Sequence, residues 1–264
     1  MKRYIHLYFS YVKRSIIARL SYKKDSFIMI FSFFIRNIAS ILSIYFIVNS
    51  IPSLEGWTMM ELGFLYGFSM IPIALDHLFT DYLWSVSYFE VRTGRMDQFF
   101  LRPIPVLFQV ISETFQVDGL GELVVGILMM SLCGSRLNVS WTFGTVLLLG
   151  VAAVFGAVIV TSIKIVFASL AFIFKTSGVL LQIAYNFSTY SRYPLKIFPK
   201  AIQWILTFLF PFALIVSIPV EIAIFRSASP YILSLIIIGV AAVFLGIAIG
   251  VWNFCAKRYE SSGS

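Results

Sequence analysis

Five ionisable side chains interrupt long apolar segments of the chain, and their positions could support chemistry. They are Arg36, Asp76, His77, Asp118 and Glu122. Charged groups inside a membrane are costly, and those that occur usually pair with one another or line the path of an ion or substrate. We treat them as candidate pathway residues, with a purely structural pairing between helices as the alternative.

Two of these residues have similar estimated depths. At a rise of about 1.5 Å per residue, Arg36 lies about 15 Å from the start of its apolar segment, and Asp118 lies about 18 Å from residue 106. Matching depths predict an Arg36–Asp118 ion pair, with Glu122 one turn further on the same helix face. If residues 106–117 lie along the membrane surface, this depth argument does not apply.

Other polar residues of these segments have simpler interpretations. Asp76 and His77 could form a proton-handling pair, although a buried histidine that is satisfied by its neighbour is the simpler reading. Lys164 lies about 33 Å from the outer start of its segment, so its long side chain could reach the inner headgroups. Asp81 is expected near the same interface. No residue is assigned a catalytic role.

A second cluster lies in the polar segment 88–105, where charged residues surround an apolar centre. Its candidate residues are Arg92, Gly94, Arg95, Met96, Asp97, Phe99, Leu101 and Arg102. A charged rim around an apolar centre is typical of protein docking surfaces. The alternative is a solvated loop whose basic residues are placed by membrane topology alone.

The elements that must position these residues are membrane helices. The chain has 264 residues, of which 59% are hydrophobic and 12% are charged, and its mean hydropathy is +0.92. Soluble domains contain about 25% charged residues, so this chain has too little polar surface to be one. Its apolar runs are about 20 residues long, which predicts an all-α, polytopic transmembrane protein.

The net charge of +8 reflects topology and anionic headgroups, and we expect no nucleic-acid partner. Residues 1–25 combine basic side chains with apolar and aromatic residues at three- and four-residue spacing. This pattern predicts an amphipathic helix in the cytoplasmic membrane interface. Residues 26–260 would then form the membrane domain, and 261–264 a short tail.

About six spans, with both termini in the cytoplasm, fit the apolar runs. Five of the predicted spans are residues 26–48, 60–84, 106–132, 142–172 and 231–255. Two arrangements are open for the remaining span. Either 179–190 belongs to it and 195–225 is a re-entrant hairpin from outside, or 201–225 is the span. Positive-inside counting favours the second arrangement.

Motifs of several enzyme classes are absent from the sequence. There is no G-x-x-x-x-G-K-[ST] nucleotide-binding loop, no H-E-x-x-H and no G-x-S-x-G. The two cysteines, Cys133 and Cys255, are isolated and form no metal motif. We therefore expect no cofactor or metal in this chain, and if the protein does energised work, the energy would come from another subunit or from an ion gradient.

Two stretches resemble type-2 ABC exporter permeases, in a branch formerly catalogued as a domain of unknown function. The first runs from Arg92 to Pro103 and continues through 107–109 and 115–123. The second is 192–199, with the apolar run that follows it to Pro211. Together with the span pattern and the basic N-terminus, the resemblance covers nearly the whole chain.

The resemblance implies a permease subunit that forms half of a translocation path. Separate cytoplasmic ATPase subunits, carrying ATP and Mg²⁺, would drive it. Residues 92–103 would be the coupling helix that docks on the ATPase, with 2–24 as the connecting helix against it. The resemblance also favours a re-entrant hairpin at 195–225. It further implies a second, related permease subunit, a bacterial cell membrane, and export of substrates such as drugs or lipids.

Two functions of other classes are alternatives. An ion-coupled secondary transporter would also contain broken helices and buried acids. A membrane-embedded lipid-modifying enzyme could use Asp76, His77, Asp118 or Glu122. Neither alternative accounts for the motif at 92–103.

Overall fold

The computed structural model describes residues 2–21, 35, 42, 56–137, 139 and 141–261, and this part of the chain is helical without strands. Three helical stretches are long and apolar enough to cross a membrane: Met59–Thr80, Phe143–Phe174 and Pro230–Ala256. Two bent helix pairs would raise the number to five. The predicted span at 26–48 lies outside the described residues except for Ile35 and Leu42.

Helix α3 (Met59–Thr80) begins at a capping box. The Thr58 backbone N–H donates to Glu61 Oε2 at 2.6 Å, and the Glu61 N–H donates to Thr58 Oγ1 at 3.4 Å. These bonds satisfy backbone donors that a helix start otherwise leaves free. The chain continues through α4 (Tyr82–Ser85) and a π-helical turn, η1 (Val86–Glu90), into the polar segment that follows.

Helix α3 packs closely against α7 (Asp118–Gly134), the second half of a bent pair. The first half, α6 (Val106–Glu113), meets α7 at 71°. A Cβ atom on Gly67 would lie 2.6 Å from the Met130 backbone nitrogen, and one on Gly126 would lie 2.8 Å from the Gly67 carbonyl oxygen. Small residues allow membrane helices this close an approach.

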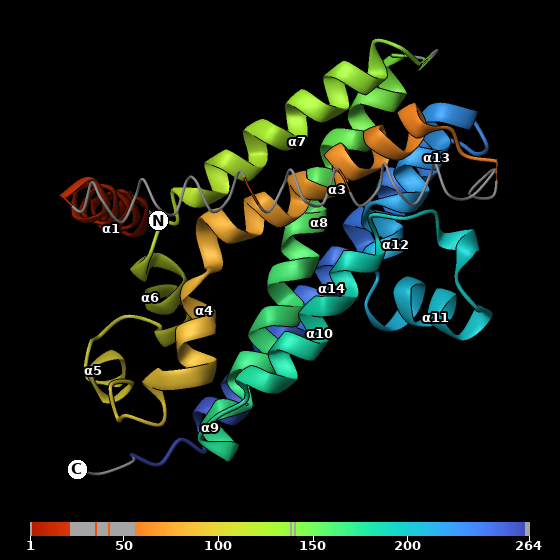
Figure 1. Cartoon of the computed structure of the whole chain (residues 1–264). Coiled ribbons are helices and arrows are strands. Elements are labelled where there is room, and N and C mark those ends of the chain that lie inside the picture. Colours follow the sequence, from red (N-terminus) through yellow and green to blue (C-terminus); the bar gives the residue numbers. More distant parts are fainter. Residues whose placement is uncertain are drawn as a thin grey trace.

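Helices α8 (Phe143–Ser169) and α14 (Pro230–Ala256) lie side by side and run in the same direction. At their starts, Gly144 lies against Pro230. Beyond α8, the short α9 (Ala171–Phe174) brings Phe172 to 5.0 Å from Trp252, between ring centroids. We call the end where these helices finish the loop end, because segment 91–105 lies there, and the other the far end (Figure 1).

The chain between these two helices starts at the loop end, where the Ser177 N–H donates to the Ser87 carbonyl at 2.9 Å. Helix α10 (Gly178–Tyr190) then packs along α8. The elements after it are the 3₁₀ turn η2 (Leu195–Ile197), α11 (Lys200–Trp204), the π-helical turn η3 (Ile205–Leu209), α12 (Phe212–Ile215) and α13 (Ser217–Phe225). Residues 200–209 and 212–225 form the second bent pair, also at 71°.

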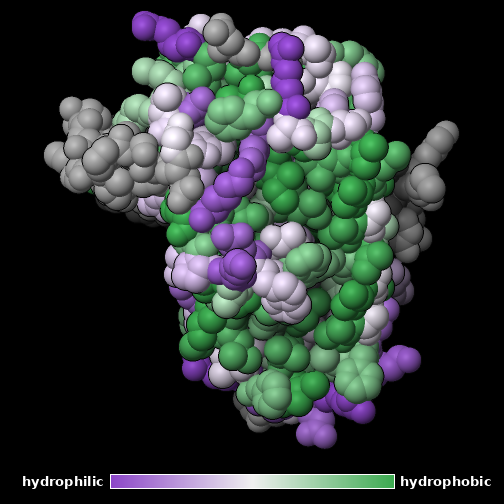
Figure 2. Space-filling view, turned by 90° about the vertical axis from the view of Figure 1, so that its right-hand side faces the viewer, coloured by the Kyte–Doolittle hydropathy of each residue, from purple (hydrophilic) through white to green (hydrophobic). Residues whose placement is uncertain are grey.

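The surface of the bundle is largely apolar. Figure 2 shows a broad hydrophobic area, with hydrophilic residues gathered toward the two ends and one hydrophilic group within it. Helix α14 illustrates the reason, because only 28% of its most apolar window is buried in the protein although its mean hydropathy is 3.0. Such a helix needs an apolar solvent.

Helix α1 (Lys2–Ser21) lies against the bend between α6 and α7 (Figure 1). Its Ser15 hydroxyl donates to the Glu113 carbonyl at 3.4 Å and accepts from the Phe115 N–H at 3.3 Å. Phe9 and Ile17 remain 64% and 55% exposed. The predicted N-terminal helix therefore exists over residues 2–21 and presents exposed apolar side chains.

Candidate functional site

A fully buried ion pair joins α3 to α8 in the middle of the bundle. The Lys164 ammonium nitrogen lies 2.6 Å from Asp76 Oδ2, and neither side chain is exposed. Two threonine hydroxyls, from Thr80 and Thr161, donate to the other carboxylate oxygen of Asp76, at 2.6 and 2.8 Å. These bonds satisfy a charge that would otherwise be very costly to bury.

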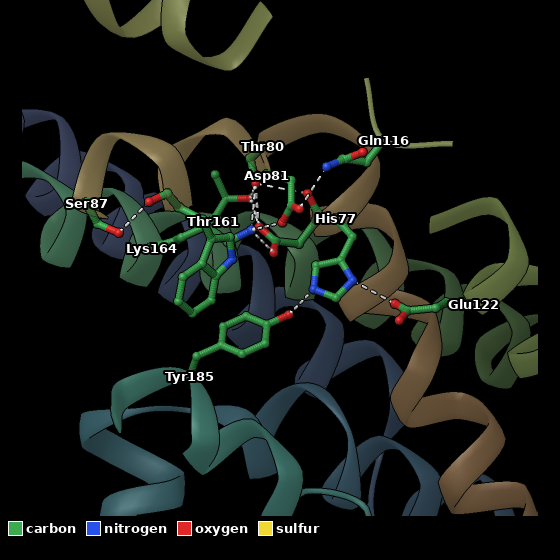
Figure 3. Close-up of polar contacts among 11 residues, drawn as sticks. His77, Thr80, Asp81, Ser87, Gln116, Glu122, Thr161, Lys164 and Tyr185 are labelled. Atoms are coloured by element: carbon green, nitrogen blue, oxygen red, sulfur yellow. Dashed lines mark hydrogen bonds and ion pairs between the residues drawn. The ribbon is translucent and has the colours of Figure 1, made fainter. Parts of the chain in front are cut away.

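A histidine relay lies beside this pair and joins three helices (Figure 3). His77 Nδ1 lies 2.7 Å from Glu122 Oε2 on α7, and His77 Nε2 lies 2.6 Å from the Tyr185 hydroxyl oxygen on α10. A neutral imidazole that carries its proton on Nδ1 satisfies both contacts, donating to the carboxylate and accepting from the phenol. A doubly protonated ring would donate in both directions.

The relay and the ion pair meet at Tyr185. Its ring centroid lies 5.8 Å from Lys164 Nζ and 5.8 Å from the centroid of the His77 ring. His77 and Glu122 are 25% and 14% exposed, so the relay leads from the buried pair toward the surface. The arrangement can hold a proton, and it joins α3, α7, α8 and α10 to one another.

Asp76 and His77, which could have formed a proton-handling pair, have separate partners, and Lys164 pairs with Asp76 and does not extend to the headgroups. Neighbouring residues of a helix point about 100° apart. Asp76 therefore faces α8, while His77 faces α7 and α10. Lys164 has a buried counter-ion, which removes the need for its ammonium to extend to water. The Lys164 ammonium nitrogen also lies 3.4 Å from Asp81 Oδ1.

The depth argument for an Arg36–Asp118 pair also fails, because Asp118 begins α7 after the bend and does not lie inside a straight helix. Arg36 itself is outside the described residues. Asp118 and Glu122 do share one helix, one turn apart. At the start of α7, the Asp118 carboxylate lies where the helix dipole favours negative charge.

The second candidate site is segment 91–105, which we call the docking loop. Met96 and Phe99 are buried beneath it, at 0% and 1% exposure. The Gln109 side-chain amide donates to the carbonyls of Phe99 and Ile104, at 2.9 and 2.7 Å, and so ties the loop to α6. Gly94 turns the chain at φ +73°, a conformation that favours glycine.

The outer surface of the docking loop carries the charges that the sequence indicated. Arg92, Arg95 and Arg102 are exposed, and Leu101 is 84% exposed between them. The Arg102 guanidinium lies 5.6 Å from the Phe99 ring centroid and 3.4 Å from the Tyr11 hydroxyl of α1. The loop is therefore a rigid, basic surface with an apolar side chain at its crest, in contact with α1.

Asp97 points away from this surface toward the C-terminal tail. Its two carboxylate oxygens accept from the Tyr259 hydroxyl at 2.7 Å and from the Ser261 hydroxyl at 2.6 Å. These bonds lower the pKa of the Asp97 carboxyl. Burial and the bond to Asp97 raise the pKa of the Tyr259 phenol.

The sequence interpretation missed Tyr185, Tyr259 and the true role of Lys164, because each meets a partner that is distant in the chain. Only Lys164 gave a signal, as a cation within an apolar run. In the described part of the chain, no group of three or more His, Cys, Asp or Glu side chains could hold a metal ion.

An apolar helical bundle with a structured polar loop at one end has a counterpart among known families. The family model described as ABC-2 family transporter protein matches residues 34–263. The chain belongs to the ABC-2 transporter family. It is thus a multi-pass permease, a membrane transport subunit of the ABC class, as the resemblance at 92–103 and 192–211 predicted. Comparisons with curated proteins and with solved structures gave no match.

Family membership accounts for the missing nucleotide-binding loop. ABC-2 permeases associate with ABC ATPase components. The ATP site can therefore lie on such a component. The chain is thus a membrane transport subunit.

Proposed function

We propose that this chain is one half of an ABC exporter and that a separate ATPase docks on residues 91–105. The observation that carries the proposal is the construction of the docking loop. Buried Met96 and Phe99 hold it rigid, while three arginines and the 84% exposed Leu101 face outward. An apolar crest within a charged rim suits a protein groove better than open water.

The loop end would be cytoplasmic in this proposal. Basic side chains lie there in the docking loop, at Lys175 and at Lys257 and Arg258, as is typical of cytoplasmic ends. The positive-inside count is not the basis of the hairpin at 195–225, because that arrangement leaves Arg192, Lys196, Lys200 and Arg226 outside. Helix α1 contacts both the loop and the α6–α7 bend. With its exposed Phe9 and Ile17, it would lie in the inner interface beside the ATPase.

A second permease subunit would cover part of α10. Gln182, Asn186 and Thr189 are exposed on this helix, and the Gln182 amide donates to the Asn186 side-chain oxygen at 2.8 Å. Amide side chains facing lipid are unfavourable, whereas they stabilise contacts between membrane helices. The translocation path would then run along this face between two permeases, with 195–225 as a hairpin dipping in from outside.

The test is copurification of the permease in mild detergent from its native membrane, in three forms. Wild type should bring an ATPase subunit with it. The double variant Arg95→Glu, Leu101→Asp should lose most of it, because both the charge and the apolar crest are reversed. Arg136→Glu is the control, since Arg136 is also exposed but follows α7 at the far end.

Three outcomes separate the parts of the proposal. Loss of the ATPase in the loop variant alone supports docking at 91–105. Retention of the ATPase in that variant would mean that it docks elsewhere. A wild-type chain that brings no ATPase would overturn the exporter proposal and favour an ion-coupled transporter.

A further inference from the structure

One tyrosine makes both a polar and an apolar contact between the C-terminal tail and the docking loop. The Tyr259 hydroxyl donates to Asp97 Oδ1 at 2.7 Å. Its ring stacks on the Phe100 ring, with centroids 4.9 Å apart and planes 4° from parallel. A polar and an apolar contact thus hold the two ends of α5 (Asp97–Phe100), the short helix in the centre of the loop.

The same tyrosine is connected to the end of α14. Its ring meets Phe172 edge to face at 5.7 Å, and Phe172 meets Trp252 in the same way at 5.0 Å. Trp252 is 1% exposed and belongs to α14. Next to Tyr259, the Glu260 carbonyl accepts from the Lys175 ammonium at 2.7 Å. The aromatic rings form a continuous packed row from α5 to the last turns of α14.

We propose that Tyr259 is a positioning residue that couples the docking loop to α14. The inference rests on the proposed function, in which an ATPase moves this loop. Gln109 ties the loop to α6, while Tyr259 ties it to the end of α14 together with the Ser261–Asp97 bond and the Phe100–Phe172 ring contact at 6.1 Å. Among these side chains, Tyr259 alone contacts both ends of α5 and the ring of Phe172. With Tyr259 in place, a displacement of the loop should move α14 as well as α6, and without it α14 should follow less.

The first measurement is hydrogen–deuterium exchange of the full-length permease in nanodiscs, without nucleotide. The backbone N–H groups of Asp97, Phe100 and Leu101 are bonded within the loop and report its order. Tyr259→Ala should speed exchange over 92–103 by about 3- to 10-fold, the range expected for one lost hydrogen bond and its packing. Tyr259→Phe, which keeps the ring, should have a smaller effect.

Tyr231→Phe is the matched control, because Tyr231 lies at the far end, where α14 begins. It should leave loop exchange unchanged. Unchanged exchange over 92–103 in Tyr259→Ala would overturn the inference, whether or not an ATPase docks there. This exchange measurement needs no partner protein, so its result does not depend on whether the proposed function is correct.

The second measurement uses the copurified complex and tests coupling, which a merely structural role would not affect. Adding ATP with vanadate should change exchange in the loop and at 249–256 in wild type. In Tyr259→Ala the loop should still respond while the response at 249–256 is clearly reduced. If 249–256 responds equally in both, α14 follows the ATPase by another route and the inference is wrong.

Discussion

Lys164 and Asp76 form an ion pair in which the ammonium nitrogen lies 2.6 Å from a carboxylate oxygen and neither side chain is exposed. The pair binds the later half of α8 to α3, and two threonine hydroxyls complete the shell of the carboxylate. In a bilayer no water replaces a lost partner. Each residue is therefore strongly dependent on the other.

Removing one member of this pair should lower the free energy of unfolding more than removing both. Lys164→Met leaves a buried carboxylate and should lower the free energy of unfolding by about 3–5 kcal/mol. The double variant Lys164→Met, Asp76→Asn leaves no charge and still offers an amide oxygen to both threonines, so it should be the more stable of the two. Unfolding in mixed detergent micelles measures the double variant and both single variants, Lys164→Met and Asp76→Asn. A double variant as unstable as the sum of the single variants would show that the two side chains are not coupled.

The glycine contact between α3 and α7 should tolerate no side chain. In Gly67→Ala the new Cβ would meet backbone atoms of α7 at 2.6 Å, and backbone cannot rotate aside. Such overpacking costs about 1–3 kcal/mol. Gly150→Ala on α8 is the matched control, because nothing lies within 4 Å of its Cβ position. The free energy of unfolding of Gly150→Ala should be unchanged or raised by about 0.5–1 kcal/mol. Equal melting temperatures for both variants would refute the close contact.

The relay through His77 should contribute a modest amount to stability. Tyr185→Phe removes the hydroxyl 2.6 Å from His77 Nε2 and keeps the ring. Hydrogen bonds between membrane helices contribute about 0.6 kcal/mol on average and up to about 1.7 kcal/mol. Tyr190→Phe, on the same helix and 42% exposed, should change stability less. A larger loss in Tyr190→Phe would contradict the assignment of the relay.

The contact between the tail and the docking loop should depend on pH at both extremes. The pKa of Asp97 is lowered from 3.8 in the folded chain, so its contribution is present above pH 3.8 and is lost as the pH falls through the lowered value. The pKa of Tyr259 is raised from 10.0, so its contribution is complete below pH 10 and is lost only above the raised value. The tail should therefore stay attached from about pH 4 to beyond pH 10.

A spin label at Glu260→Cys would report this attachment, because Glu260 is exposed while Cys133 and Cys255 are buried. The label should be immobile at neutral pH and become mobile below pH 3.8. In Asp97→Asn, which has no carboxyl to titrate, the acid transition should disappear. A transition that persists in this variant must come from another group.

The long apolar runs could be predicted from composition because bilayer thickness fixes their length. The runs at 142–172 and 231–255 closely match the helical stretches Phe143–Phe174 and Pro230–Ala256. The sequence indicated the bend after Glu113 only in part. Polar residues there suggested a surface segment, but the 71° angle depends on how α6 packs against its neighbours.

The buried charges show what a single sequence does not reveal. Lys164 looked like a residue that could reach the headgroups, since length alone placed it near an interface. Its partner Asp76 lies on a different helix, and only packing brings the two together. The direction of His77 could have been inferred from the helical turn of about 100° per residue, but its partners on α7 and α10 could not.

Because α8 and α14 run in the same direction, the number of times that residues 175–229 can cross the bundle is restricted. A chain that leaves one helix at the loop end and enters the next at the far end must traverse the bundle an odd number of times. One traverse more or fewer would reverse α14 and place Tyr259 at the opposite end from Asp97. The 2.7 Å bond between these two residues therefore reports that the intervening chain crosses the bundle an odd number of times.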